Sequence, residues 1–322
     1  MPDKAHKQTD KKLLKMEQHI KDIYAQAEGD MRAKWEEFME NAEKRTVKLR
    51  ERLEAALKGN DPKEIKEARA ALQQRLEYVT FRNEQYKKMV EQMVANYEHA
   101  NEIALAYING ELPEIYTLNY NYIGKDIEKQ VGRNVQKAFA KEYSFTLVDQ
   151  NTVYLLAKKN KSLLPYKKVN VPKDLRWNTK QINAQVMQGI LQGESMHKIA
   201  ARLQTVTDMT SSAAIRNART MVTGAENAGR MRAADKAIDD GVVMKKSWLA
   251  THDERTRDWH MDLNGVEVEN DEPFENDYGK IMYPGDPHAH PANVYNCRCT
   301  LVYVVVGIKK PNGEIVYFKG GK

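Results

Sequence analysis

The stretch Lys58-Gly59-Asn60-Asp61-Pro62 divides the first third of this 322-residue chain into two long segments of helical periodicity. Gly59 suits the left-handed conformation that ends a helix, and Asp61 and Pro62 suit the cap and first turn of the next helix. A connection this short makes the two flanking helices antiparallel. At ~1.5 Å per residue, each helix would be roughly 70 Å long. The stretch therefore predicts a long antiparallel helical hairpin.

Both arms of this hairpin show apolar side chains at helical spacing. Residues 10–58 have the pattern of one amphipathic helix, with a slip of register near Gly29. The second arm alternates its apolar positions by four and three, which is the coiled-coil repeat. This seam consists of Leu72, Leu76, Val79, Asn83, Tyr86, Val90, Met93, Tyr97, Ala100, Ala104 and Tyr107. Gly110 and Pro113 are predicted to end the second helix. We expect residues 1–110 to be a coiled-coil arm that serves as a spacer or in homo-oligomerisation, and not as the core of a globule.

The next part of the chain, residues 111–240, has the pattern of a basic and mostly helical middle domain. The helices expected here cover residues 123–142, 178–191, 195–203 and 211–240, and residues 145–175 are expected to be irregular with short strands. The last of these helices has a face of alanines that includes Gly229, and small residues let another backbone approach closely. Gly241 is expected to stop it.

The periodicity changes from helical to alternating after Gly241. Strands are expected over residues 242–249, 280–283 and 297–306, and Asn-Gly turns at 264–265 and 312–313 are typical of β-hairpins. Residues 241–322 are therefore predicted to form a small β-rich module. The predicted fold class of the chain is α+β, mainly α, with a helical hairpin, a helical middle domain and this C-terminal module.

The net charge of +6 is unevenly distributed, because residues 111–250 are strongly basic and residues 251–322 are net acidic. A basic middle suits a nucleic acid or an acidic protein surface, although solvation of helices explains such lysines and arginines equally well. The N-terminus lacks the pattern of a signal peptide, and no apolar run approaches the ~20 residues of a membrane helix. Two cysteines are too few for a disulfide framework, so we expect reduced thiols in a cytoplasmic setting.

Half of the histidines and both cysteines lie within fifty residues near the C-terminus. On a strand, Cys297 and Cys299 would project from the same face, and two thiolates with two imidazoles make a tetrahedral zinc site. His260 is the best third ligand. The fourth is His252, with Asp253 or His290 as alternatives. The competing interpretation is that the cysteines are small buried hydrophobic residues and that the histidine is hydrogen-bonded in the core.

Other metal chemistries are less well matched by these residues. A zinc deaminase needs His-x-Glu and Cys-x-x-Cys, and neither pattern is present. A zinc-dependent hydrolase or nuclease that uses Asp253, Asp258 and His260 remains the alternative function. The favoured explanation of the acidic residues in this stretch is that they form ion pairs with Arg255 and Arg257. A phosphate-binding glycine loop and a serine nucleophile elbow are both absent from the sequence.

Several phrases occur in an order that is specific in combination. Arg219 to Arg230 forms an Arg-Thr…Glu-Asn-Ala-Gly-Arg helix, and Lys246-Ser-Trp precedes the phrase from His252 to His260. Asn296-Cys-Arg-Cys follows at the end. This stretch, from about residue 180 to 305, resembles the phage minor head proteins of the Mu F-like head morphogenesis family. Thr220-Met221 departs from that pattern, because the family often has an acidic residue there.

The resemblance implies a virion component without enzymatic activity. Such a protein is present in few copies inside the capsid near the portal vertex, and it is built in during procapsid assembly in the host cytoplasm. The partners that the resemblance implies are the portal protein and the major capsid or scaffolding protein. It also implies a role in DNA packaging or ejection, and the basic middle of the chain suits non-specific contact with packaged DNA.

Overall fold

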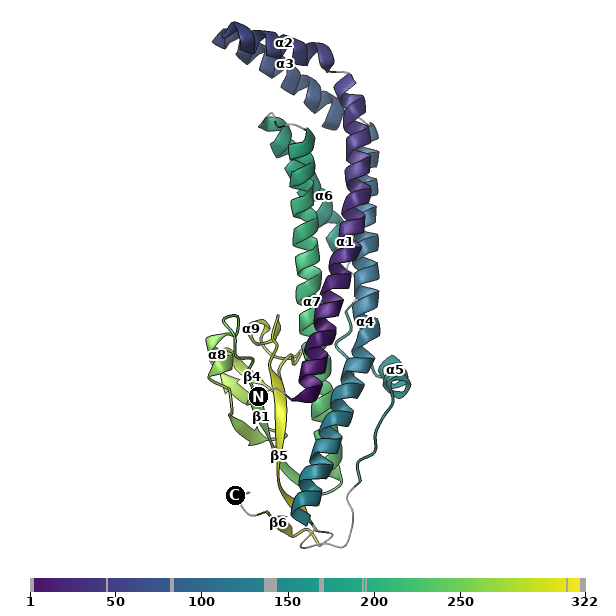
Figure 1. The fold of residues 1–322 in the computed structure, drawn as a ribbon, viewed down its shortest axis with the longest axis vertical. Coiled ribbons are helices and arrows are strands. Elements are labelled where there is room, and N and C mark those ends of the chain that lie inside the picture. Colours follow the sequence, from purple (N-terminus) through teal and green to yellow (C-terminus); the bar gives the residue numbers. More distant parts are fainter. Residues whose placement is uncertain are drawn as a thin grey trace. The chain divides into compact units, whose positions relative to one another are not determined.

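The computed structural model describes residues 3–44, 46–81, 84–135, 144–167, 171–192, 194, 196–310 and 312–318. The helices are α1 (Lys4–Lys44), α2 (Val47–Gly59), α3 (Pro62–Phe81), α4 (Glu84–Val135), α5 (Gln150–Lys159), α6 (Val171–Leu191), α7 (Met196–Asp239), α8 (Asp258–Met261) and α9 (Pro291–Val294). The strands are β1 (Val242–Leu249), β2 (Glu267–Glu269), β3 (Phe274–Asn276), β4 (Gly279–Ile281), β5 (Thr300–Lys309) and β6 (Ile315–Tyr317). Figure 1 shows that long helices dominate the chain and that the strands gather at its C-terminal end. The predicted fold class, α+β and mainly α, is confirmed.

The chain forms two compact units, each assembled from separate stretches of sequence. Unit 1 comprises residues 1–18, 106–167 and 215–322, and unit 2 comprises residues 19–105 and 168–214. Helices α1, α4 and α7 contribute residues to both units. The sequence predicts three domains with boundaries after residues 110 and 240. That division follows sequence pattern and not contacts in space, and it stays a prediction.

Unit 2 contains a hydrophobic core of its own. Four helices contribute to it, with Trp35 from α1, Tyr97 from α4, Val186 from α6 and Leu203 from α7 among the buried side chains. The hydroxyl groups of Tyr97 and Thr207 are in hydrogen-bond contact inside it. The expectation that the hairpin would lack a globular core is therefore wrong, because α6 and α7 cover the apolar faces of its arms.

The helical hairpin is present, but its helices begin and end differently from the prediction. Asp61 accepts a hydrogen bond from Lys63 N at 2.9 Å, which confirms the predicted cap, but the left-handed residue is Asn60, with a φ of 52°, and not Gly59, which is the last residue of α2. The first arm was predicted as one helix over residues 10–58, but it consists of two helices, α1 and α2. Helix α4 continues through Pro113 because the residues around it are buried, and this burial outweighs the local cost of proline, which is about 3 kcal/mol.

The middle of the chain is more helical than expected. Helix α5 occupies part of the stretch predicted to be irregular with strands, and Asp149 caps it by accepting from Thr152 N at 2.9 Å. Helix α6 begins well before Asn178, which is buried inside it instead of capping it. The two helices predicted over 195–203 and 211–240 are one helix, α7. The end of the helix predicted over 123–142 lies outside the described residues.

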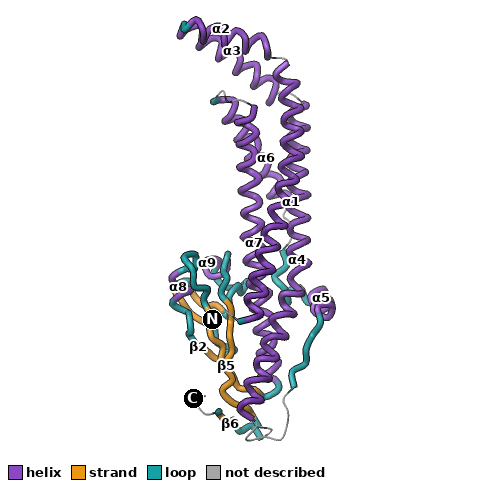
Figure 2. Tube along the Cα trace, in the orientation of Figure 1, coloured by secondary structure: helices purple, strands orange, loops and turns teal. Residues whose placement is uncertain are grey.

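Unit 1 contains a four-stranded antiparallel sheet in the order β2-β1-β5-β6, together with the β3-β4 hairpin (Figure 2). Strand β1 has the predicted bounds, and Gly241 precedes it with a φ of 94°. Strand β5 pairs with β1 in a register that places Leu249 opposite Thr300. β5 starts three residues later than predicted, so both cysteines lie just before it. No helix in the described ranges is both long and apolar enough to cross a membrane.

Candidate metal centre

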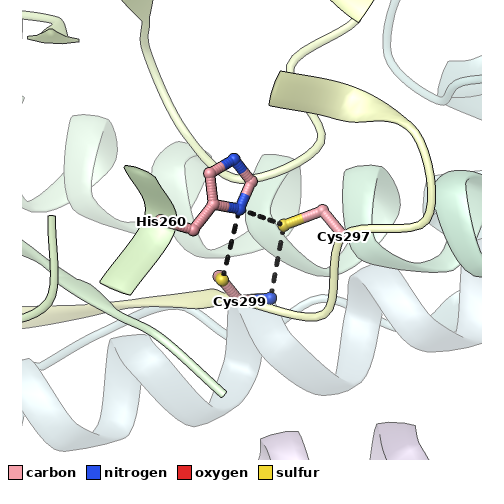
Figure 3. A group of neighbouring side chains, drawn as sticks. All are labelled: His260, Cys297 and Cys299. Atoms are coloured by element: carbon pink, nitrogen blue, oxygen red, sulfur yellow. Dashed lines mark hydrogen bonds between the residues drawn. The ribbon is translucent and has the colours of Figure 1, made fainter. Parts of the chain in front are cut away.

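Three side chains that can bind metals meet beside the start of β5 (Figure 3). His260 belongs to the short helix α8, whereas Cys297 and Cys299 lie in the segment between α9 and β5. The Nδ1 atom of His260 is 3.5 Å from Cys297 Sγ and 3.7 Å from Cys299 Sγ. The three donor atoms lie within 4.8 Å of one another, and all three side chains are buried. The structure thus confirms that the sequence identified neighbours in space.

The spacing of these donors fits a tetrahedral metal site. Zinc binds thiolate sulfur at about 2.3 Å and imidazole nitrogen at about 2.0 Å, so two tetrahedral ligands of these kinds lie about 3.6 Å apart. The observed nitrogen–sulfur distances of 3.5 and 3.7 Å bracket this value. Two soft thiolates with one imidazole are also a donor set that suits zinc. The triad of His260, Cys297 and Cys299 is therefore compatible with zinc.

Local packing fixes the orientation of the imidazole. Trp248 on β1 is fully buried and meets the His260 ring edge-on, with the ring centroids 5.3 Å apart. The backbone N–H of His260 donates to Arg257 O at 2.9 Å at the start of α8. Its Nε2 atom has no hydrogen-bond partner in the described part of the chain. A proton on Nε2 leaves the lone pair of Nδ1 facing the two sulfurs, as a metal ligand requires.

The two thiols are unequal because they face each other in a buried setting. A hydrogen bond from Cys297 lowers the pKa of Cys299, His260 adds to this effect, and burial opposes it. The same pairing, together with burial, raises the pKa of Cys297. Cys299 therefore loses its proton before Cys297 does. Because the thiolate is the form that binds metal, Cys299 is the better metal ligand of the two.

None of the three candidates for a fourth ligand joins the triad. His252 is exposed and lies outside the group of donors. Asp253 accepts hydrogen bonds from Arg298 at 2.5 and 2.6 Å, and this pairing holds the pKa of Asp253 far below its usual range. His290 caps α9 and stacks on Tyr278, with the ring centroids 5.7 Å apart. The described residues therefore bring three donors together, and a fourth ligand stays a prediction.

The sulfurs converge for a reason other than the predicted one. Cys297 and Cys299 are not on a strand, so the alternation of side chains along a strand does not bring them together. Asn296 has a left-handed φ of 57°, which turns the chain just before Cys297. The Cys299 N–H then donates to Cys297 Sγ at 3.4 Å. A turn stabilised by this contact places both thiols beside the histidine.

One face of α7 holds the backbone that carries the cysteines. Thr223 Oγ1 donates to Cys297 O at 2.6 Å, and Asn227 Nδ2 donates to Cys299 O at 3.2 Å. The Leu301 N–H donates to Asn227 Oδ1 at 2.9 Å. Residues four apart lie on the same face of a helix, so one helix face binds the whole segment. Sequence analysis did not single out Thr223, although its spacing from Asn227 on a face of small residues was a usable signal.

The residues proposed for a hydrolase are not arranged around a common site. His260 is only 1% exposed, and its Nδ1 faces the thiols. Asp253 is paired with Arg298 and also with Arg255, whose Nη2 lies 3.7 Å from Asp253 Oδ2, which supports the ion-pair interpretation for Arg255 and adds Arg298 to it. Asp258 is exposed at the start of α8. This arrangement favours a structural centre over a hydrolytic one.

Comparison with known proteins agrees with the order of these motifs. The model of the family described as Phage Mu protein F like protein matches residues 180–302. The chain carries a Mu F-like segment. That segment contains all of α8, the metal triad, and the residues Thr223 and Asn227 that bind the backbone of the cysteine segment. The resemblance inferred from the sequence motifs is confirmed.

Two curated proteins are similar to parts of this chain. Over 124 residues it is 37% identical to the Minor head protein GP7 of Bacillus phage SPP1, which is 38% of this chain and 39% of that protein. Over 123 residues it is 33% identical to the NAD(+)–arginine ADP-ribosyltransferase EFV of Enterococcus faecalis, which is 38% of this chain and 25% of that protein. The chain thus spans less than half of either relative. No solved structure matches it.

Proposed function

We propose that this chain is a structural minor head protein of a bacteriophage, built into the procapsid and retained inside the capsid near the portal vertex. The observation that carries the proposal is the 37% identity to the Minor head protein GP7 of Bacillus phage SPP1. The Mu F-like segment adds support, because its motif residues bind one another instead of lining an open catalytic site. In this role the chain contacts the portal protein and the major capsid or scaffolding protein, and it takes part in DNA packaging or ejection.

Contact with packaged DNA is part of the same proposal. The basic stretch of residues 111–250 supplies the positive charge that phosphate groups attract without reading sequence. Binding of this kind weakens steeply as salt concentration rises. Oligomerisation through the helical arm also stays a proposal. In unit 2 the arm already buries apolar residues within one chain.

The metal triad has a structural role in this proposal. His260, Cys297 and Cys299 would hold zinc, and zinc would supply bonds that join α8 to the segment before β5. The purified chain is expected to contain one zinc by elemental analysis. His260→Ala should lose the metal, whereas His252→Ala should keep it, because His252 is exposed and outside the triad. Equal metal content in both variants would exclude the triad as the site.

The head-protein proposal is tested in assembled particles. Mass spectrometry of purified heads should detect the chain, and chemical cross-linking of procapsids should join it to the portal protein. Disruption of its gene should reduce the yield of DNA-filled, infectious particles. Absence of the chain from purified heads would contradict the proposal.

Two observations are reasons to test the chain for enzymatic activity. One relative is named an ADP-ribosyltransferase, and acidic residues lie near His260 in the sequence. A DNA-cleavage assay on the purified chain addresses the hydrolase alternative. We expect no cleavage. Cleavage that His260→Ala abolishes in a chain with an unchanged circular dichroism spectrum would favour a metal-dependent nuclease instead.

A further inference from the structure

The first residues of the chain pack against the Mu F-like segment. Asp3 and the start of α1 belong to unit 1, together with most of α7 and the whole sheet. Within residues 3–10, which we call the N-terminal latch, the buried side chains are Ala5, His6 and Thr9. The only apolar one is an alanine, so hydrophobic burial contributes little to holding these first turns in place. Their attachment depends on polar contacts instead.

The latch supplies partners to two buried charges of α7. Arg230 is fully buried, and its guanidinium donates to the Asp3 carboxylate at 2.6 and 3.0 Å. Glu226 is 2% exposed, and its Oε1 is 2.8 Å from His6 Nδ1 and 3.2 Å from Arg230 Nη2. Burial of a charge is costly unless the charge is paired. Glu226 and Arg230 pair with each other within the Mu F-like segment, and the latch adds a second ionic partner to each of them.

His6 is surrounded by charges from α7 and from the latch itself. Glu226 and Arg230 face it from α7, Asp10 lies 3.7 Å from its Nε2 on the next turn of α1, and the Asp3 side chain accepts its backbone N–H at 2.9 Å. Strand β5 contributes Thr300, whose hydroxyl donates to Glu226 Oε1 at 2.8 Å. Arg230 is a cation that acts on the imidazole and Arg298 is one that acts on Asp10, but Glu226 and Asp10 outweigh Arg230 at His6. This environment favours the protonated form of His6.

The direction of titration follows from these contacts. Burial lowers the pKa of His6, but Glu226 and Asp10 raise it more, so the net shift is upward from the ordinary value of 6.5. Burial likewise opposes ionisation of Glu226, but His6 and Arg230 keep its pKa below the ordinary value. A base with a raised pKa in the bound state stabilises that state at low pH, and the stabilisation is lost as pH rises through the raised pKa. At pH values between the pKa of Glu226 and the pKa of His6, Glu226 is ionised and His6 is protonated, so the ion pair is fully formed.

We propose that residues 3–10 are a pH-sensitive latch, which closes on α7 while His6 carries a proton and loosens when His6 becomes neutral. Neutral His6 can still donate one hydrogen bond to Glu226, so the latch weakens without unfolding of unit 1. Loosening leaves Arg230 and Glu226 exposed on the face of α7 that otherwise binds Asp3 and His6. This inference holds for the isolated chain, independently of any role in a phage head.

Hydrogen exchange of the full-length wild-type chain tests the latch directly. Protection factors, corrected for the intrinsic pH dependence of exchange, are compared at about pH 6 and about pH 8. Protection of residues 3–10 should fall roughly fivefold at the higher pH, as expected when a charge-assisted hydrogen bond becomes a neutral one. Protection of β5 should stay the same. Unchanged protection of residues 3–10 would overturn the proposal.

Two glutamine variants separate His6 from other titrating groups. His6→Gln keeps a hydrogen-bond donor near Glu226 but cannot change its charge, so its protection should no longer depend on pH. His99→Gln is the matched control, because His99 is an exposed helical histidine in unit 2, and it should behave like the wild type. A His6→Gln chain that retains the full pH dependence would show that another group controls these residues.

Discussion

Lys246 is an unusual residue because its charged group is fully buried in unit 1. Its Nζ donates to Met282 O at 3.0 Å and lies 5.4 Å from the centre of the Phe274 ring. Burial lowers the pKa of Lys246 from 10.5 to about 8, although acidic groups such as Asp235 act in the opposite direction. Lys246 therefore makes the folded state less stable at neutral pH than a neutral side chain of the same shape would.

This shift predicts a dependence of stability on pH. Between about pH 8 and 10.5 the folded chain binds fewer protons at Lys246 than the unfolded chain, so the free energy of unfolding rises with pH in that window. Lys246→Met should remove this rise and should gain up to ~3 kcal/mol at neutral pH, less the lost hydrogen bond. Urea unfolding at several pH values measures both effects. Lys245→Met is the control, since this neighbour on β1 is partly exposed and should change little.

The residue types in the metal centre also explain which of its ligands could be predicted from the sequence. Cys297, Cys299 and His260 could be identified because cysteines are few and the three lie close together in sequence. The positions of the candidates for a fourth ligand could not be predicted, because they depend on the path of the loop after β1. There Arg298 binds Asp253, and Thr251 Oγ1 donates to Arg298 O at 2.6 Å.

At the level of elements, close packing of α7 on α4 depends on one glycine. A Cβ atom on Gly229 would lie 2.5 Å from the backbone oxygen of Tyr116, a contact that neither backbone can relieve without moving. The small face predicted for this helix is thus confirmed at the place where two helices of unit 1 meet. Helix α7 can hold both the cysteine segment and the N-terminal latch because α4 supports it from another side.

Gly229→Ala is expected to destabilise unit 1 by about 1–3 kcal/mol, because the added methyl group overpacks this contact. Gly132→Ala on α4 is a matched control, since nothing lies within 4 Å of its added Cβ. That control should gain about 0.5–1 kcal/mol from improved helix propensity. Thermal unfolding of the two variants gives the comparison. Similar destabilisation by both would show that α7 and α4 are not closely packed at Gly229.

The elements themselves were predicted unevenly. Strand β1 follows from local pattern and was found with its correct bounds, and the turn between α2 and α3 was found with its left-handed residue one position too early. Helix α5 was missed because lysines, prolines and β-branched residues in its neighbourhood favour irregular structure. Pro113 inside α4 was read as a helix end because a local rule cannot include the burial of the surrounding turn.

For the whole molecule, the two units have separate cores, and this predicts separate responses to mutation. The triad of Cys297, Cys299 and His260 lies in unit 1, whereas Trp35 is fully buried in the core of unit 2. Cys297→Ser should destabilise the sheet and the segment before β5 while most of the helical circular dichroism signal remains. Hydrogen exchange should show the loss in β1 and β5 only.

The reciprocal change completes this test. Trp35→Ala should lower the stability of unit 2 by about 3–5 kcal/mol, because it opens a cavity in a closed core, and it should leave the metal content unchanged. Joint loss of both units in either variant would contradict separate responses. Helices α1, α4 and α7 pass through both units, so they are the elements that would transmit such coupling.

The sequence by itself determined the helical hairpin, the C-terminal strands, the members of the metal triad and the resemblance to a phage head protein. These features depend on periodicity, turn residues and rare residue types that lie near one another along the chain. Only the tertiary structure decided that Asp3 and His6 pair with Arg230 and Glu226, more than two hundred residues away. No local pattern specifies such partners, because the free energy that selects them comes from neutralising charges that folding has already buried.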